Sequence, residues 1–338
     1  MARLRRADCS EPGIRRIRSG RGFRYVDEAG DPIRGRDARE RISSLVIPPA
    51  WRDVWICTDP LGHIQATGID DAGRKQYLYH DAWRARRDRQ KFEQMLELAD
   101  LLPGLRKRLR KRLKQPGLTR DRVLAGAVLL LDLGFFRIGG ETYAEQNDSY
   151  GLATIRKTHV HAQNGAVIFD YPAKSSQRRV QEITDPQLVK LVRSLKARNG
   201  GGRELLAYRR GREWVDVRSA EVNDHLKDLT GSDLSAKDFR TWNATVLAAV
   251  LLAAHDREAG SKTSRQRIAR KVVGEVAELL GNTPAVCRRS YIDPRVFDCF
   301  DSGTTIREDL GRYAGKGLDD LPATARDRIE GAVIRLLS

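Results

Sequence analysis

The chain has 338 residues, of which 40% are hydrophobic, and this length suits one large domain or, more naturally, two. Lysine and arginine total 62 against 45 aspartate and glutamate residues, so the net charge is +17 and the long-range field favours polyanions such as nucleic acid. The four cysteines lie far apart with no CxxC pair, so neither a zinc site nor a disulfide framework is indicated, and a reducing cytosol fits. No apolar run approaches the ~18 residues of a membrane span, so we expect a soluble, cytoplasmic protein.

The N-terminal part of the chain predicts small strands and turns. Its first 40 residues are rich in Arg and Gly, include strand-like pieces such as GFRYV, and are expected to be loosely ordered at the start. In IPPAWRDVWICTD and GHIQATGIDDAGRKQYLYH, aromatic and β-branched residues alternate between prolines and glycines. We expect a β-rich domain over residues 1–82 and a mainly helical domain over residues 83–338.

A helical pattern begins at Asp81, where WRARRDRQKFEQMLELADLL places apolar residues three and four apart. The basic segment 106–114, RKRLRKRLK, follows, while Leu105, Leu109 and Leu113 recur at every fourth position. On a helix these leucines form a narrow buried stripe beneath a broad cationic face. That face is either a solvated surface or a phosphate-contacting one, and the pattern favours neither.

The middle of the chain alternates between helix and sheet. TRDRVLAGAVLLLDLGFFRIGG predicts a buried helix that begins at a threonine cap and ends at glycine. Two alternating runs then meet at Asn164-Gly165, a strong hairpin signal, and the strand QRRVQEI follows the turn that carries Lys174. After Pro186 we expect helix almost to the end. The predicted fold class is α+β, with a small β-rich N-terminal domain and a larger helical domain that contains a three-stranded β element.

The candidate site residues are cations at the ends of elements, together with one tyrosine. The sequence lacks GxxxxGK[ST], HExxH and GxGxxG motifs, which disfavours nucleotide hydrolysis and zinc peptidase chemistry. Alone, an arginine at a helix end usually balances the helix dipole, and a tyrosine usually packs at the rim of a core. The candidates are Arg137, Lys174, Arg240, and Tyr291 within LLGNTPAVCRRSYIDP.

In their order along the chain, GRKQYLYH, FFRIGGETY, DYPAKSSQ, KDFRTWNAT and LLGNTPAVCRRSYIDP resemble the small type IB DNA topoisomerases of poxviruses and bacteria, the bacterial members most closely. The resemblance implies that Tyr291 attacks a DNA phosphodiester and becomes linked to the 3′ phosphate. It also implies that Arg137 and Arg240 hold the non-bridging oxygens, and that Lys174 protonates the departing 5′ oxygen. Asn282 falls where many relatives carry histidine, and it retains a hydrogen-bond donor without a proton-transfer role.

The resemblance further implies the partners and the surface that contacts them. We expect a monomer that clamps double-stranded DNA in the nucleoid, without a cofactor or metal. From residues alone, Tyr77 and Tyr79 would more often be packing residues of a strand. The residues expected to contact DNA are Arg74, Lys75, Gln76, Tyr77, Tyr79 and Tyr143.

Elementary chemistry agrees with these roles. A phenol has a pKa near ~10, so it needs nearby cations to ionise at neutral pH. Fixed guanidinium groups stabilise the charge that develops on phosphoryl oxygens without requiring a metal. A tyrosyl ester retains the energy of the bond it replaced, so the free 5′ hydroxyl can reseal the strand without ATP.

Two other functions compete with this interpretation. Tyrosine recombinases share the Arg, Lys, Arg, Tyr order, but they usually begin the HxxR motif with histidine, where this chain has Lys237 ahead of Arg240. A non-enzymatic DNA-binding protein would explain the charge but not the five ordered motifs.

Overall fold

The computed structural model describes residues 3–174, 177–313 and 323–338. The chain divides into two compact units, Met1–Gln90 and Lys91–Ser338. The helix α2, Asp81–Leu113, begins where the sequence pattern changes and continues past this division. The expected boundary between residues 82 and 83 thus lies in the first turn of a helix.

The first unit is built on an antiparallel sheet of five strands in the order β2-β1-β3-β4-β5. Its small core joins Ile14, Ile42, Val54, Ile56 and Ala66. The edge strand β5 alternates exposed with half-buried residues, as expected for a strand with one face toward solvent. The strands are β1 Ile14–Ser19, β2 Gly22–Val26, β3 Arg52–Ile56, β4 Ile64–Ile69 and β5 Lys75–Tyr79.

The start of the chain is more ordered than we expected. The strands β1 and β2 form a hairpin there, and the helix α1, Arg36–Ser44, follows. The sequence RDARERISS gave no helical signal because Ile42 is the one residue of α1 that is buried, so the apolar periodicity is almost absent.

Two helices that are buried on nearly every side form the centre of the second unit. They are α3, Arg120–Gly134, and α7, Ala236–Ala254, and nearly all their side chains are buried. Thr119 caps α3 by accepting a hydrogen bond from the backbone N–H of Arg122, as the sequence predicts. The predicted leucine stripe of α2 is also confirmed, since Leu105, Leu109 and Leu113 are buried in the same core.

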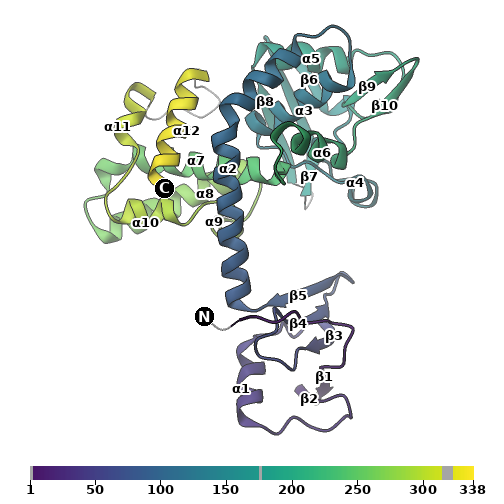
Figure 1. Cartoon of the computed structure of the whole chain (residues 1–338), viewed down its shortest axis with the longest axis vertical. Helices are drawn as coiled ribbons and strands as arrows, with labels where there is room; N and C mark the ends of the chain where they lie inside the picture. The colour runs from purple at the N-terminus through teal and green to yellow at the C-terminus, as the bar shows by residue number, and fades with distance from the viewer. Residues whose placement is uncertain (1–2, 175–176, 314–322) are drawn as a thin grey trace. The chain divides into compact units, whose positions relative to one another are not determined.

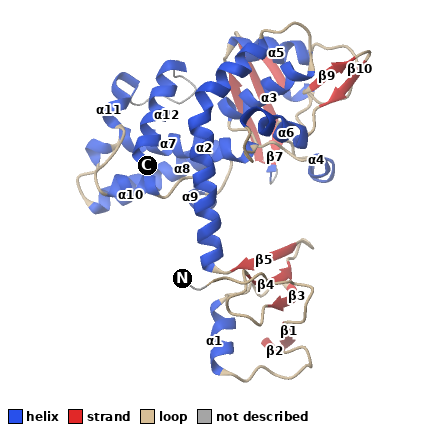
Figure 2. Ribbon diagram, viewed as in Figure 1, coloured by secondary structure: helices blue, strands red, loops and turns tan. Residues whose placement is uncertain are grey.

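A three-stranded antiparallel sheet in the order β6-β7-β8 lies against this helical core (Figure 2). Its strands are β6 Val160–Gln163, β7 Ala166–Ala173 and β8 Gln177–Ile183. Asn164 and Gly165 form the turn between β6 and β7 with φ values of 47° and 81°, so the hairpin predicted from this dipeptide is confirmed. The predicted α+β fold class and the three-stranded element are therefore correct.

The prediction that the chain is helical almost to its end after Pro186 misses one β-hairpin. A two-stranded hairpin, β9 Ala207–Arg210 and β10 Glu213–Asp216, turns at Gly211, whose φ is +62°. These strands have only four residues each and carry several charges, so their alternation is too short to detect. The other helices are α4 Glu141–Asn147, α5 Pro186–Lys196, α6 Ser219–Thr230, α8 Lys262–Leu280, α9 Pro284–Ser290, α10 Arg295–Asp301, α11 Arg307–Leu310 and α12 Ala323–Leu337 (Figure 1).

A membrane span was not expected, and among the residues that the structure describes no helix combines the length and apolar character that crossing a bilayer requires.

Candidate active site

Tyr291 is placed by two consecutive helix boundaries. The helix α8 ends at Leu280, and Gly281 follows with a φ of +61°, which a glycine adopts without strain. Thr283 then caps α9, and Pro284 occupies its first turn. Because α9 ends at Ser290, Tyr291 stands at the C-cap, where the backbone leaves the helix and the ring is half-buried.

Arg137 lies in the loop between α3 and α4. Phe135 ends α3 in a left-handed conformation, with a φ of 52°. The loop then packs closely on a neighbouring turn, since a Cβ added at Gly151 would lie 2.5 Å from the Cα of Gly139. The Arg137 Nη2 atom donates hydrogen bonds to the Gly281 carbonyl at 2.8 Å and to Asn282 Oδ1 at 2.5 Å.

Arg240 is buried one turn into α7. Its Nη2 atom donates to the Leu280 carbonyl at 2.9 Å, and its Nη1 atom donates to the Phe135 carbonyl. The buried Nε atom has no hydrogen-bond partner among the described residues. The guanidinium carbon lies 5.3 Å from the centre of the Tyr291 ring, within the range of a cation–π contact.

Lys174 directly follows β7, at the turn that leads to β8, and its side chain is exposed. A cavity of about 330 Å³ is lined by Arg137, Lys174, Arg240 and Tyr291 together. The structure thus gathers into one cavity four residues that are up to 154 positions apart (291 − 137).

The positive charges around the cavity lower the pKa of Tyr291. Burial alone would raise the pKa of Tyr291, but the charges of Arg240 and Arg137 outweigh burial and lower the pKa from its ordinary value. Burial, followed by the charge of Arg137, lowers the pKa of Arg240 to about 10. A negative charge at this position, whether a phenolate or a phosphate, would relieve the repulsion between the two guanidinium groups.

Asn282 does not line this cavity but is hydrogen-bonded to Arg137, which does. Its Oδ1 atom accepts the hydrogen bond from Arg137, which fixes the orientation of the amide. Its Nδ2 atom is buried without a partner in the described part of the chain. A buried donor without a partner costs stability, so this amide is ready to donate to an oxygen brought by a ligand.

The residues expected to contact DNA lie on different units. On β5, Lys75, Tyr77 and Tyr79 are exposed on one face, and the two tyrosine rings stack with centroids 6.1 Å apart. Gln76 instead donates to Asp70 at 2.9 Å, and Arg74 also pairs with Asp70. The packing interpretation of the two tyrosines is therefore not supported, because 42% of Tyr77 and 39% of Tyr79 is exposed.

Tyr143 belongs to the second unit, on α4, and it lines the same cavity as Arg137 and Tyr291. Its ring is 45% exposed.

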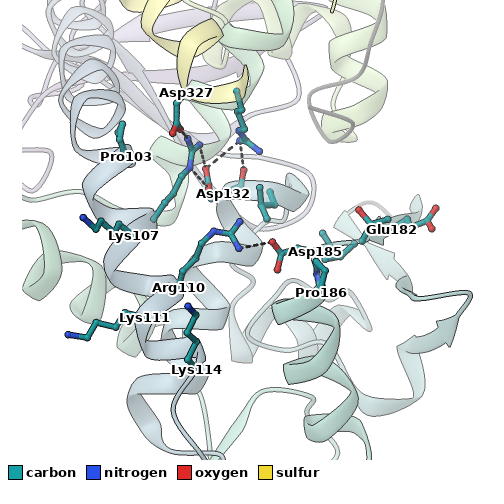
Figure 3. Close-up of a pocket in the computed structure, with 15 residues that line it drawn as sticks. Pro103, Lys107, Arg110, Lys111, Lys114, Asp132, Glu182, Asp185, Pro186 and Asp327 are labelled. Atoms are coloured by element: carbon teal, nitrogen blue, oxygen red, sulfur yellow. Dashed lines mark hydrogen bonds and ion pairs between the residues drawn. The ribbon is translucent and has the colours of Figure 1, made fainter. Parts of the chain in front are cut away.

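The basic segment 106–114 divides into structural and exposed cations. Arg106 is almost fully buried and pairs with Asp132, Asp327 and Glu330. Arg110 pairs with Asp185 at 2.7 Å. Figure 3 shows the pair of Arg110 with Asp185 at a cavity of about 720 Å³, whose lining also includes Lys107, Lys111 and Lys114, all three exposed. For these lysines both interpretations of the cationic face, a solvated surface and a phosphate-contacting one, stay predictions.

One further cation at the cavity was not proposed as a site residue. Lys237 is exposed in the first turn of α7, lines the cavity, and contributes to the lowered pKa of Tyr291. The sequence held a usable signal, because Lys237 precedes Arg240 by three residues, nearly one helical turn.

Comparisons with known families match both units. The family model described as "Eukaryotic DNA topoisomerase I, catalytic core" matches residues 80–301, and the one described as "Bacterial DNA topoisomerase IB, N-terminal domain" matches residues 22–70. The match to the catalytic core includes all five residues expected to act in catalysis.

Individual relatives agree with the family models. The chain is 30% identical to DNA topoisomerase 1B of Acanthamoeba polyphaga mimivirus over 289 residues, covering 83% of this chain and 85% of the relative. It is 19% identical to DNA topoisomerase 1B of Vaccinia virus (strain Copenhagen) over 77% of this chain and 81% of the relative. DNA topoisomerase 1 of Schizosaccharomyces pombe is 32% identical over 47% of this chain and 19% of that longer protein.

Proposed function

The chain belongs to the type IB DNA topoisomerase family, and from that premise we propose that the protein relaxes supercoiled duplex DNA by cutting and resealing one strand, with Tyr291 as the nucleophile. The phenolic oxygen of Tyr291 attacks a backbone phosphorus atom. The bond from phosphorus to the 5′ oxygen breaks, and the 3′ phosphate stays on the tyrosine. Torsion in the DNA turns the free end, and attack by the 5′ hydroxyl on the phosphotyrosine reverses the step.

The single observation that carries this proposal is the cavity shared by Tyr291, Arg137, Lys174 and Arg240. Its guanidinium groups are held by backbone carbonyls before any ligand arrives, so little reorganisation is needed when charge develops on the phosphoryl oxygens. The unpartnered Nε atom of Arg240 is a free donor for one of those oxygens. The free Nδ2 atom of Asn282 is a second such donor.

Lys174 is the proposed general acid because the β7–β8 hairpin brings its ammonium group to the cavity that Tyr291 also lines. An alkoxide is a poor leaving group, so its protonation contributes ~10² to 10⁴ fold to the rate. A sulfur atom at the 5′ bridging position would leave as a thiolate, whose conjugate acid has a pKa near ~8.5, and would not need this proton.

The proposal extends to the partner and the setting. The net charge of +17 and the exposed β5 tyrosines suit a duplex DNA partner. We expect the protein to act as a monomer on the nucleoid, in the cytoplasm, and without a small-molecule cofactor.

Relaxation of a supercoiled plasmid tests the proposed function. In EDTA and without ATP, the protein should relax both positive and negative supercoils, because the torsion itself drives rotation of the cut strand. A folded, DNA-binding preparation that relaxes neither would contradict the proposal. Products recombined between two DNA sites would instead support the recombinase alternative.

A further inference from the structure

A third arginine binds the same helix end as the two arginines of the cavity. Arg179, on β8, donates from Nη1 to the Glu278 carbonyl at 2.9 Å and from Nη2 to the Leu279 carbonyl. Arg240 and Arg137 hold the next two carbonyls of the chain. The last carbonyls of a helix lack partners within the helix and carry the negative end of its dipole, so three guanidinium groups can gather there.

The position of Arg179 connects this helix end to the proposed general acid. In the register of the β7–β8 hairpin, Arg179 is paired with Tyr171, and Ala173 is paired with Gln177. Lys174 comes directly after Ala173. Arg179 is therefore the contact by which the outer half of the hairpin is fixed to the end of α8, a few residues from Lys174.

The Lys174 side chain has little else to position it. It is exposed, and no hydrogen bond or ion pair holds its ammonium group within the described ranges. Deeper in the hairpin, Gln181 donates to the Gly134 carbonyl at the end of α3. On β7, level with Arg179, the Tyr171 ring stacks on Phe136 with centroids 6.3 Å apart, and the next carbonyl, of Pro172, accepts from the backbone N–H of Tyr150 at 2.9 Å. These contacts hold the base of the hairpin and the strand β7, whereas on β8 it is Arg179 that binds the end of α8.

We propose that Arg179 is a positioning residue for the cleavage reaction, which docks the β7–β8 hairpin on the C-terminal end of α8 and so places Lys174 at the leaving oxygen. Arg179 faces the helix end rather than the cavity, which it does not line. It acts through Lys174 and not on the phosphate. The inference rests on the proposed function.

The test compares an ordinary DNA substrate with one that carries sulfur at the 5′ bridging position. Arg179→Ala should slow cleavage of ordinary DNA by about 10²-fold, the loss that follows from misplacing a catalytic group by about 1 Å. On the sulfur substrate it should cleave at close to the wild-type rate, as Lys174→Ala should. Arg179→Lys keeps the charge but loses the planar pair of donors, so it should show a smaller, equally sulfur-restored defect.

Arg178→Ala is the matched control. Arg178 directly precedes Arg179 on the same strand, is exposed, and pairs with Asp170 instead of α8. Replacing it with alanine removes the same charge, so the ratio of cleavage rates on the two substrates should equal that of the wild type. An equal defect of Arg179→Ala on both substrates would overturn the inference. If Arg179→Ala does not fold, the same outcome with Arg179→Lys would overturn it.

The failure of the proposed function would look different. In that case the wild-type protein would cleave neither substrate, or Lys174→Ala would not be restored by sulfur. If the inference alone fails, the wild-type protein still cleaves both substrates, and sulfur still restores cleavage by Lys174→Ala.

Discussion

At the residue scale, Arg240 and Asn282 each combine fixed hydrogen bonds with one buried donor that has no partner among the described residues. Arg240 binds two carbonyls and keeps its Nε atom unpartnered among the described residues, while Asn282 accepts from Arg137 and keeps its Nδ2 atom free. Buried donors without partners cost free energy in the empty protein. In the proposed mechanism a bound phosphate would recover that cost, in the way that preorganised donors stabilise a transition state.

The separate roles of Lys174 and Arg240 can be distinguished by the leaving group. Lys174→Ala should cleave ordinary DNA ~10² to 10⁴ fold more slowly than the wild type and should cleave the sulfur substrate at close to the wild-type rate. Arg240→Ala should remain slow on both substrates, because the non-bridging oxygens that Arg240 is proposed to contact are unchanged by the sulfur. Single-turnover cleavage measures both rates. If sulfur failed to restore Lys174→Ala, Lys174 would be a phosphate-positioning cation, and Arg137 would become the candidate acid.

At the scale of elements, the ends of helices determine the site. The end of α3 carries the Arg137 loop, the head of α7 carries Arg240, and the end of α8 receives both guanidinium groups. A buried ion cluster supports these ends from behind. Asp132, in the last turn of α3, pairs with Arg106 of α2 and Arg326 of α12, and these charges outweigh burial to lower its pKa.

From this ion cluster we expect the charge of Arg106, within the basic segment, to be essential for stability. Arg106→Met should lower the free energy of unfolding by about 3 to 5 kcal/mol, because it leaves buried carboxylates with too little compensating charge. Lys107→Met, its exposed neighbour on the same helix, should change it by less than ~0.5 kcal/mol. Urea unfolding followed by circular dichroism measures both, and similar effects from the two variants would contradict the role of the cluster.

The sequence predicted the elements but not all of their contacts. The buried helices, the Asn164-Gly165 hairpin and the leucine stripe follow from local periodicity and turn chemistry, and the site residues followed from ordered motifs. Arg106 looked like any other cation of its segment, since its acidic partners lie as far away in the chain as Glu330. Arg179 binds backbone carbonyls, which every sequence contains, so no pattern could mark it.

At the scale of the whole molecule, the excess of positive charge governs binding to DNA. Each phosphate that the protein neutralises releases counterions, so the logarithm of affinity should fall with the logarithm of salt concentration by about 0.9 per phosphate. With ~6 contacts, affinity should fall about a thousandfold between ~50 and ~200 mM salt. Fluorescence anisotropy with a labelled duplex measures the slope, and a slope near zero would be incompatible with an extensive phosphate-binding surface.

The same titration decides the role of the exposed lysines in the basic segment. Replacing Lys111 and Lys114 with alanine should reduce the slope by about 2 if both contact phosphates. An unchanged slope would assign them to a solvated surface.

The most direct test of the account is the covalent adduct itself. The wild-type protein should form an adduct with a 3′ end of cleaved DNA that survives a denaturing gel, and Tyr291→Phe should form none while binding DNA with nearly the same affinity. Only a hydroxyl is lost, from a surface whose affinity comes mainly from phosphate contacts. Peptide mapping of the wild-type adduct should place the DNA on Tyr291. An adduct that persists in Tyr291→Phe, on Tyr208, Tyr313 or any other residue, would contradict the central claim.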